Sequence, residues 1–167
     1  MRVFVDASVL IHWLNKTNDY ENIEKIRKYA DSCILERLIT SPEVELEICK
    51  GKNGFDDWSR INREWKLKKC IGVNTPLSGI EAAVKDVTGI VNRAKEKYNK
   101  LFKVTKNQKD TLHYSTAENI EEADYFLVVD KDFCREMSIE AAHLPQSTKI
   151  VNPKELVSII LKKEHNE

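Results

Sequence analysis

The sequence predicts a single α/β domain of three layers, in which helices cover both faces of a central, mostly parallel sheet. Val3–Val5 and Tyr125–Val129 are short runs of β-branched and aromatic residues, the pattern of strands that are buried on both faces. Strand and helix patterns also alternate along the 167 residues, as expected for a parallel sheet with crossover helices. A chain of this length buries roughly two-thirds of its unfolded surface, so one domain forms without disulfides.

The first half of the chain predicts two strand–helix units. Apolar residues at helical spacing predict one helix after Asp6 and a second over residues 19–33. A short apolar run at 38–39 is the expected second strand. Ser41-Pro42 then supplies a hydroxyl cap and a proline for the first turn of a helix that Gly51 is placed to end.

Residues 51–76 are expected to form an elaboration that contains a short helix and, at Cys70–Val73, a third strand. Trp58, Ile61 and Trp65 make an apolar stripe on this helix. The same segment carries basic residues, namely Arg60, Arg63, Lys66, Lys68 and Lys69. The tryptophans could stack on nucleic-acid bases, but packing in the core or on a second subunit, with solvated basic residues, is the interpretation that we favour.

A capping box at Ser78-Gly79-Ile80-Glu81 begins a long amphipathic helix that reaches Leu101. Its last turns and the next loop carry seven basic residues and one acid: Arg93, Lys95, Lys97, Lys100, Lys103, Lys106 and Lys109, with Glu96. A helix dipole explains a few cations in a last turn, but this run is longer and leads directly into Asp110. We therefore expect Lys103, Lys106 and Lys109 to contact the phosphate backbone of a nucleic-acid strand.

The last third predicts a helix over 110–123, the strand Tyr125–Val129, and a helix through Cys134 and Met137. A final strand at Lys149–Val151 leads into a closing helix that Asn152-Pro153-Lys154-Glu155 caps.

Composition and charge exclude several classes of protein. Basic and acidic residues balance at 27 each, which argues against blanket affinity for nucleic acid but allows local patches. The four cysteines are scattered, without a C-x-x-C pair for zinc or redox chemistry. Strand residues begin directly after Met1-Arg2, so we expect no signal peptide, no membrane span and a location in the reducing cytoplasm.

Acidic residues follow both buried strands, at the edge where ligands bind in open α/β sheets. Asp6 ends the first strand, and Asp130 ends the second, with Asp132 two residues later. An ordinary helix cap explains Asp6 and Ser8 equally well, but two strands that both end in acids favour a site. The full set of candidates is Asp6, Glu47 (or Glu43), Asp110 and Asp130, with Asp132 as an auxiliary. Converging carboxylates need a cation to offset their repulsion, and oxygen ligands favour Mg²⁺ or Mn²⁺ over zinc.

These segments resemble the motifs of the PIN-domain family, which includes VapC-type toxin ribonucleases and archaeal relatives. The opening V-F-V-D-A-S-V-L-I resembles the first motif, with Asp6 as a metal-binding acid and Ser8 as its supporting residue. S-P-E-V-E-L-E resembles the second and selects Glu47, D-T-L-H the third, and A-D-Y-F-L-V-V-D-K-D-F the fourth. The resemblance implies a metal-dependent endoribonuclease, acting in RNA processing or as a toxin with a partner antitoxin, and possible homodimers.

Two features depart from the family pattern. Val128 stands where many members have a threonine, and the segment 51–79 is longer than in compact toxins. An RNA-binding or scaffolding protein of the same fold is the main alternative, but it predicts the loss of acids that are all present here. A receiver domain or a haloacid-dehalogenase-like phosphatase is a third, and Asp6-Ala7-Ser8 offers neither the acid pair nor the D-x-D that these require.

Overall fold

The computed structural model describes residues 1–17, 19–30, 32, 34–70, 92–96, 99–100, 108–119, 122–129 and 148–165. In these ranges the chain forms an α/β fold around a five-stranded sheet in the order β3-β2-β1-β4-β5, with every strand pair parallel. The strands are β1 (Arg2–Val5), β2 (Arg37–Thr40), β3 (Lys68–Lys69), β4 (Tyr125–Leu127) and β5 (Lys149–Val151). The predicted fold class is confirmed.

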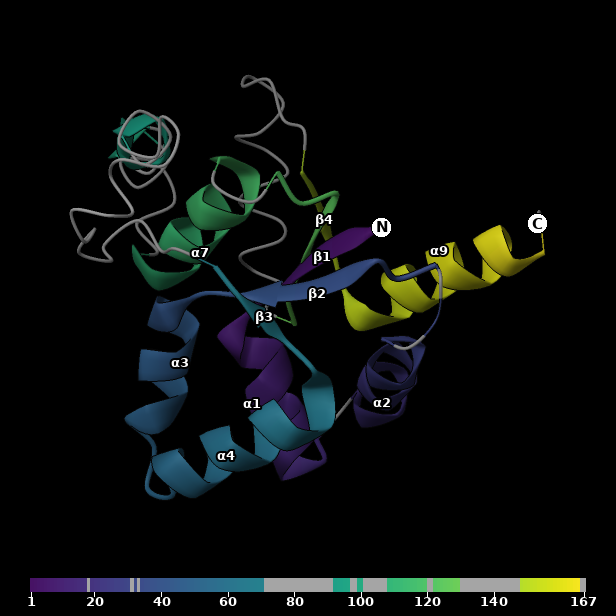
Figure 1. The fold of residues 1–167 in the computed structure, drawn as a ribbon, viewed down its shortest axis with the longest axis horizontal. Coiled ribbons are helices and arrows are strands. Elements are labelled where there is room, and N and C mark those ends of the chain that lie inside the picture. The colour runs from purple at the N-terminus through teal and green to yellow at the C-terminus, as the bar shows by residue number, and fades with distance from the viewer. Residues whose placement is uncertain are drawn as a thin grey trace.

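Helices pack on both sides of the sheet (Figure 1). The first half of the chain contributes α1 (Ala7–Asn15), α2 (Tyr20–Tyr29), α3 (Pro42–Cys49) and α4 (Gly54–Trp65), and the second half contributes α7 (Gln108–Asn119) and α9 (Pro153–Glu164). In the view of Figure 1, α7 lies above the sheet and α1, α3 and α4 lie below it. α9 packs against α2 although the two are far apart in sequence.

The strands at the centre of the sheet bury both of their faces. Val3, Phe4 and Val5 are fully buried. The Phe4 ring stacks on Phe126 of the neighbouring β4 at 5.7 Å, and Tyr114 of α7 meets Phe126 edge-on at 5.6 Å. These aromatic contacts fix α7 over the β1–β4 pair, directly beside the end of β1.

Local capping signals set the helix ends as the sequence predicts. The Ser41 hydroxyl accepts the Val44 amide and begins α3 with Pro42 in its first turn. Asn152 and Glu155 form a reciprocal capping box at the start of α9. Such caps satisfy backbone donors that the first turn of a helix leaves free.

Two elements differ from their predicted positions. β3 is Lys68–Lys69 and begins two residues before the predicted strand Cys70–Val73; the Cys70 amide donates to the Thr40 carbonyl, and residues 71–73 lie outside the described ranges. An edge strand tolerates exposed lysines because one of its sides is unpaired. The helix expected over 110–123 runs from Gln108 to Asn119 instead. Its polar first turn and the positive φ of Glu122 beyond its end explain the shift.

The tryptophans of α4 lie in the core. Trp58 and Trp65 are 5% and 0% exposed, and Trp65 meets Trp13 of α1 edge-on at 5.8 Å. Base stacking by either ring is therefore excluded, and the packing interpretation is confirmed. Within the expected elaboration the structure gives the helix α4, and residues 71–76 lie outside the described ranges.

The remaining expectations are tested only in part. The residues of the predicted long helix that the structure describes, 92–96 and 99–100, are helical, whereas the helix through Cys134 and Met137 lies outside the described ranges. Cys49 and Cys70 are free thiols, as expected. Among the helices that the structure describes, none is long and apolar enough to cross a membrane.

Candidate metal centre

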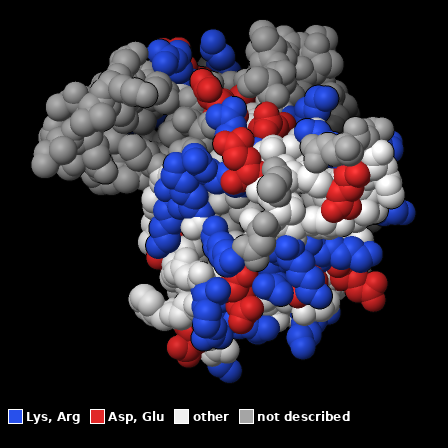
Figure 2. Space-filling view, turned by 45° about the vertical axis from the view of Figure 1, so that its right-hand side comes forward, with Lys and Arg blue, Asp and Glu red and all other residues white. Residues whose placement is uncertain are grey.

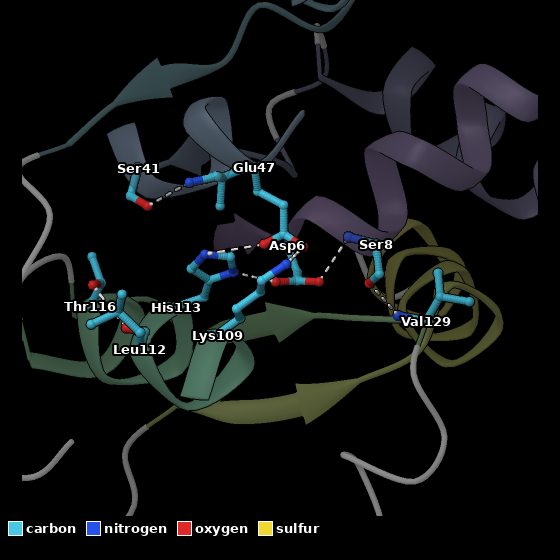
Figure 3. Close-up of polar contacts among 10 residues, drawn as sticks. Asp6, Ser8, Ser41, Glu47, Lys109, Leu112, His113, Thr116 and Val129 are labelled. Atoms are coloured by element: carbon cyan, nitrogen blue, oxygen red, sulfur yellow. Dashed lines mark hydrogen bonds and ion pairs between the residues drawn. The ribbon is translucent and has the colours of Figure 1, made fainter. Parts of the chain in front are cut away.

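Asp6 lies at the junction of β1 and α1, buried to 1% exposure. Its two carboxylate oxygens have separate partners (Figure 3): Oδ2 accepts the Ser8 amide at 2.9 Å and Oδ1 contacts Nδ1 of His113 at 2.7 Å. Asp6 is thus the N-cap of α1, so the capping and functional interpretations of this residue are both correct. One oxygen begins the helix and the other faces the site.

Ser8 links the end of β1 to the segment that follows β4. Its hydroxyl accepts the Val129 amide at 3.2 Å, and the Asp6 amide donates to Leu127 at 3.1 Å. The structure thereby holds the chain immediately before Asp130 beside Asp6, at the carboxyl ends of two parallel strands. Ser8 thus contacts both the Asp6 carboxylate and the backbone segment that follows β4.

His113 is the site residue that the sequence prediction missed. α7 carries it into the core with only 2% of its surface exposed. Its Nδ1 faces Asp6, and its Nε2 lies 3.9 Å from Glu47 of α3. The available signal was the spacing of Asp110 and His113, which are three apart and share a helix face; a lone histidine gave no reason to prefer a ligand over a core residue.

Asp6, Asp110 and His113 together could hold a metal ion. Each offers one ligand atom, and these atoms all lie within 4.8 Å of one another. Two carboxylates suit Mg²⁺ or Mn²⁺, and the imidazole shifts the preference toward Mn²⁺ and softer ions. The donor chemistry therefore fits a divalent cation, with more nitrogen character than the all-oxygen set predicted.

The second acid of the prediction was left open between Glu43 and Glu47. The structure places Glu47 at the site: its carboxylate lies 3.9 Å from His113 and 3.2 Å from the Lys109 ammonium (Figure 3). Glu47 is outside the set of atoms within 4.8 Å, so it adjoins the three-residue cluster and is not part of it. Asp130, Asp132, Lys103 and Lys106 lie outside the described residues.

The electrostatics of the site show how its central ion pair is held. Burial by itself disfavours the charged form of Asp6, but the hydrogen bond and charge of His113, together with the bonds from Ser8, outweigh it and lower the pKa of Asp6 below 3.8. Burial likewise disfavours charged His113. Bonding to Asp6, and attraction to Asp6, Glu47 and Asp110, outweigh that burial and raise the pKa of His113 above 6.5. Both shifts thus favour the charged forms of Asp6 and His113, which face each other as an ion pair.

Comparisons with protein-family models and with curated proteins found no match to this chain. The function of the chain is therefore inferred from the site itself and from the motif resemblance.

Proposed function

We propose that this protein is a metal-dependent ribonuclease of the PIN-domain type, which uses Mg²⁺ or Mn²⁺ to hydrolyse phosphodiester bonds in RNA. The observation that carries the proposal is the cluster of Asp6, Asp110 and His113 at the carboxyl edge of a parallel sheet, where open α/β folds bind their ligands. A divalent ion at such a cluster activates a water molecule and stabilises the charge that grows on the phosphate.

The chain's own residues have distinct parts in this proposal. Asp6 is kept ionised by His113 and Ser8, so it can accept a cation at neutral pH. Asp110 adds a second carboxylate from α7. His113 offers the third ligand atom, and its Nδ1 contact also orients the Asp6 carboxylate. We include Asp130 and Asp132 as further ligands, because the Ser8–Val129 contact holds the preceding backbone beside Asp6.

A polyanionic substrate requires basic groups close to these acids. Figure 2 shows Lys and Arg side chains spread over one face of the molecule with Asp and Glu among them, so that face has no unbroken basic surface. Lys109 is the described member of the proposed RNA-contacting lysines, and it lies at the site. We therefore propose that single-stranded RNA passes the start of α7, with Lys103 and Lys106 as additional contacts.

The test is cleavage of a labelled single-stranded RNA in Mn²⁺, in Mg²⁺ and in EDTA. We expect cleavage only with a divalent ion, and its loss in Asp6→Asn. Asp124→Asn is the matched control, because Asp124 is an exposed acid that accepts the Arg2 amide at the opposite edge of the sheet, and asparagine retains an acceptor oxygen. RNA binding without cleavage in any metal would contradict the nuclease proposal and favour a scaffold.

The same proposal includes a cellular role as an RNA-processing enzyme or as a VapC-type toxin with a partner antitoxin. Expression of the wild type and of Asp6→Asn in a bacterial host separates the two roles. Growth arrest by the wild type alone would support the toxin, and normal growth with both would support processing.

A further inference from the structure

Lys109 forms an ion pair with Glu47 at the edge of the metal cluster. Its Nζ lies 3.2 Å from Oε1 of Glu47, although the two residues are 62 positions apart in the sequence and belong to α7 and α3. The lysine side chain is 65% exposed and the glutamate side chain 23%. In Figure 3 the Lys109 side chain extends toward the acids and His113.

This contact adds a second cation to the charged groups around the site. Asp6, Asp110 and Glu47 bring three carboxylates, and the cations that face them among the described residues are His113 and Lys109. His113 lies 2.7 Å from Asp6 and 3.9 Å from Glu47. Among the contacts that the structure gives, Lys109 pairs with Glu47 alone. The ammonium therefore pairs with a carboxylate that adjoins the cluster without belonging to it.

We propose that Lys109 couples metal binding to RNA binding by exchanging partners. In the metal-free protein Lys109 is the counter-cation of Glu47. When a divalent ion is bound, Glu47 turns to that ion, and the released ammonium contacts a phosphate of the RNA. This inference rests on the proposed ribonuclease function and deepens it, since it assigns Lys109 a second role besides phosphate contact.

The strength of the contact suits such an exchange. An exposed lysine–carboxylate pair contributes little free energy, so a divalent ion can replace it at small cost. Removing the lysine should accordingly raise metal affinity by about two- to fivefold, not by orders of magnitude. Coupling between two ligands is reciprocal, so metal should raise RNA affinity through the same residue.

A second ion pair on the same helix provides a matched control. Lys69 Nζ contacts Oε2 of Glu45 on α3 at 2.7 Å, with the lysine side chain 47% exposed. Lys69 also lies 5.2 Å from the centre of the Trp58 ring, away from the cluster. Lys69→Met thus removes a comparable lysine–glutamate pair from α3 without changing the charge at Glu47.

The test compares the wild type, Lys109→Met, Lys109→Arg and Lys69→Met by two measurements. Calorimetry gives Mn²⁺ affinity without RNA, and fluorescence anisotropy gives the affinity for a cleavage-resistant phosphorothioate RNA in Mn²⁺ and in EDTA. For Lys109→Met we expect Mn²⁺ to bind about two- to fivefold more tightly. We also expect weaker RNA binding in Mn²⁺ only, with a log–log salt slope reduced by about 0.7. Lys109→Arg and Lys69→Met should match the wild type in Mn²⁺ affinity.

Three results would overturn the exchange: unchanged or weaker Mn²⁺ binding in Lys109→Met, an equal loss of RNA affinity in EDTA and in Mn²⁺, or Lys109→Arg behaving like Lys109→Met. These failures are distinct from failure of the proposed function. A wild type that binds no Mn²⁺ and cleaves no RNA would overturn both, whereas a wild type that does both, beside an unaltered Lys109→Met, would overturn the exchange alone.

Discussion

Replacing His113 by alanine should destabilise the metal-free protein strongly. The imidazole is buried and contacts Asp6 at 2.7 Å, and Asp6 itself is 1% exposed. Without His113, the carboxylate keeps the Ser8 amide at 2.9 Å but loses its facing cation. Breaking a buried pair by removing one partner costs about 3–5 kcal/mol, so we expect a fall of that size in the free energy of unfolding.

The same pair predicts a particular pH dependence. Because the pKa of His113 is raised above 6.5 in the folded state, its stabilisation is complete below pH 6.5 and is lost as the pH rises through the folded-state pKa. Because the pKa of Asp6 is lowered below 3.8, its stabilisation is present above pH 3.8 and is lost as the pH falls through the folded-state value. The pair should therefore contribute most between pH 3.8 and 6.5.

Urea denaturation in EDTA, at intervals from about pH 5 to 9, measures the loss of stability in His113→Ala and the loss of the His113 contribution as the pH rises. His113→Gln, which has no titrating ring, should approach the wild type in stability as the pH rises. His12→Gln is the control: this histidine is half-buried on α1 and bonds the Thr17 hydroxyl, away from the acids. A loss below about 1 kcal/mol in His113→Ala, or parallel pH profiles for the wild type and His113→Gln, would refute the reasoning.

Two further predictions concern the support of the site and the core. Ser8→Ala keeps the backbone amide that donates to Asp6 but removes the hydroxyl that accepts the Val129 amide. We expect the free energy of unfolding, measured by denaturation, to fall by about 1 kcal/mol. An unchanged free energy of unfolding would argue against a stabilising Ser8–Val129 hydrogen bond. Trp65→Ala should cost about 3–5 kcal/mol because it empties a fully buried position. Phe55→Ala, at an 81% exposed position, should leave the free energy of unfolding within about 0.5 kcal/mol of the wild type. Similar losses of stability in Trp65→Ala and Phe55→Ala would contradict the packing of α4.

The parts of the fold that the sequence predicted correctly are those set by neighbouring residues. The strand Lys149–Val151 and the Asn152 capping box depend on a few consecutive side chains, and they form where expected. The start of the third strand was predicted two residues too late, because Lys68–Lys69 pairs with the end of β2 at an edge of the sheet, where exposed polar residues are tolerated and an apolar pattern is not required. Pairing with a distant strand leaves no local signal of this kind.

In the site, too, the residues that could be predicted are those marked by their neighbours in the sequence. Asp6 was found because a buried strand ends at it, whereas His113 depends on α7 packing over that strand. The choice between Glu43 and Glu47 also needed three-dimensional placement, because both lie on one face of α3. Lys109 was predicted to contact RNA, and its pairing with Glu47 could be found only once α7 and α3 were positioned side by side.

The most direct test of the account is a calorimetric titration of the metal-free protein with Mn²⁺, for the wild type, Asp6→Asn and the control Asp124→Asn. The cluster of Asp6, Asp110 and His113 predicts one site in the wild type and in the control. Loss of even an outer partner of a metal site weakens binding by about 10- to 100-fold, so Asp6→Asn should lose at least tenfold in affinity. Equal Mn²⁺ affinity in all three proteins, or no binding by the wild type, would contradict the assignment of a metal centre to Asp6.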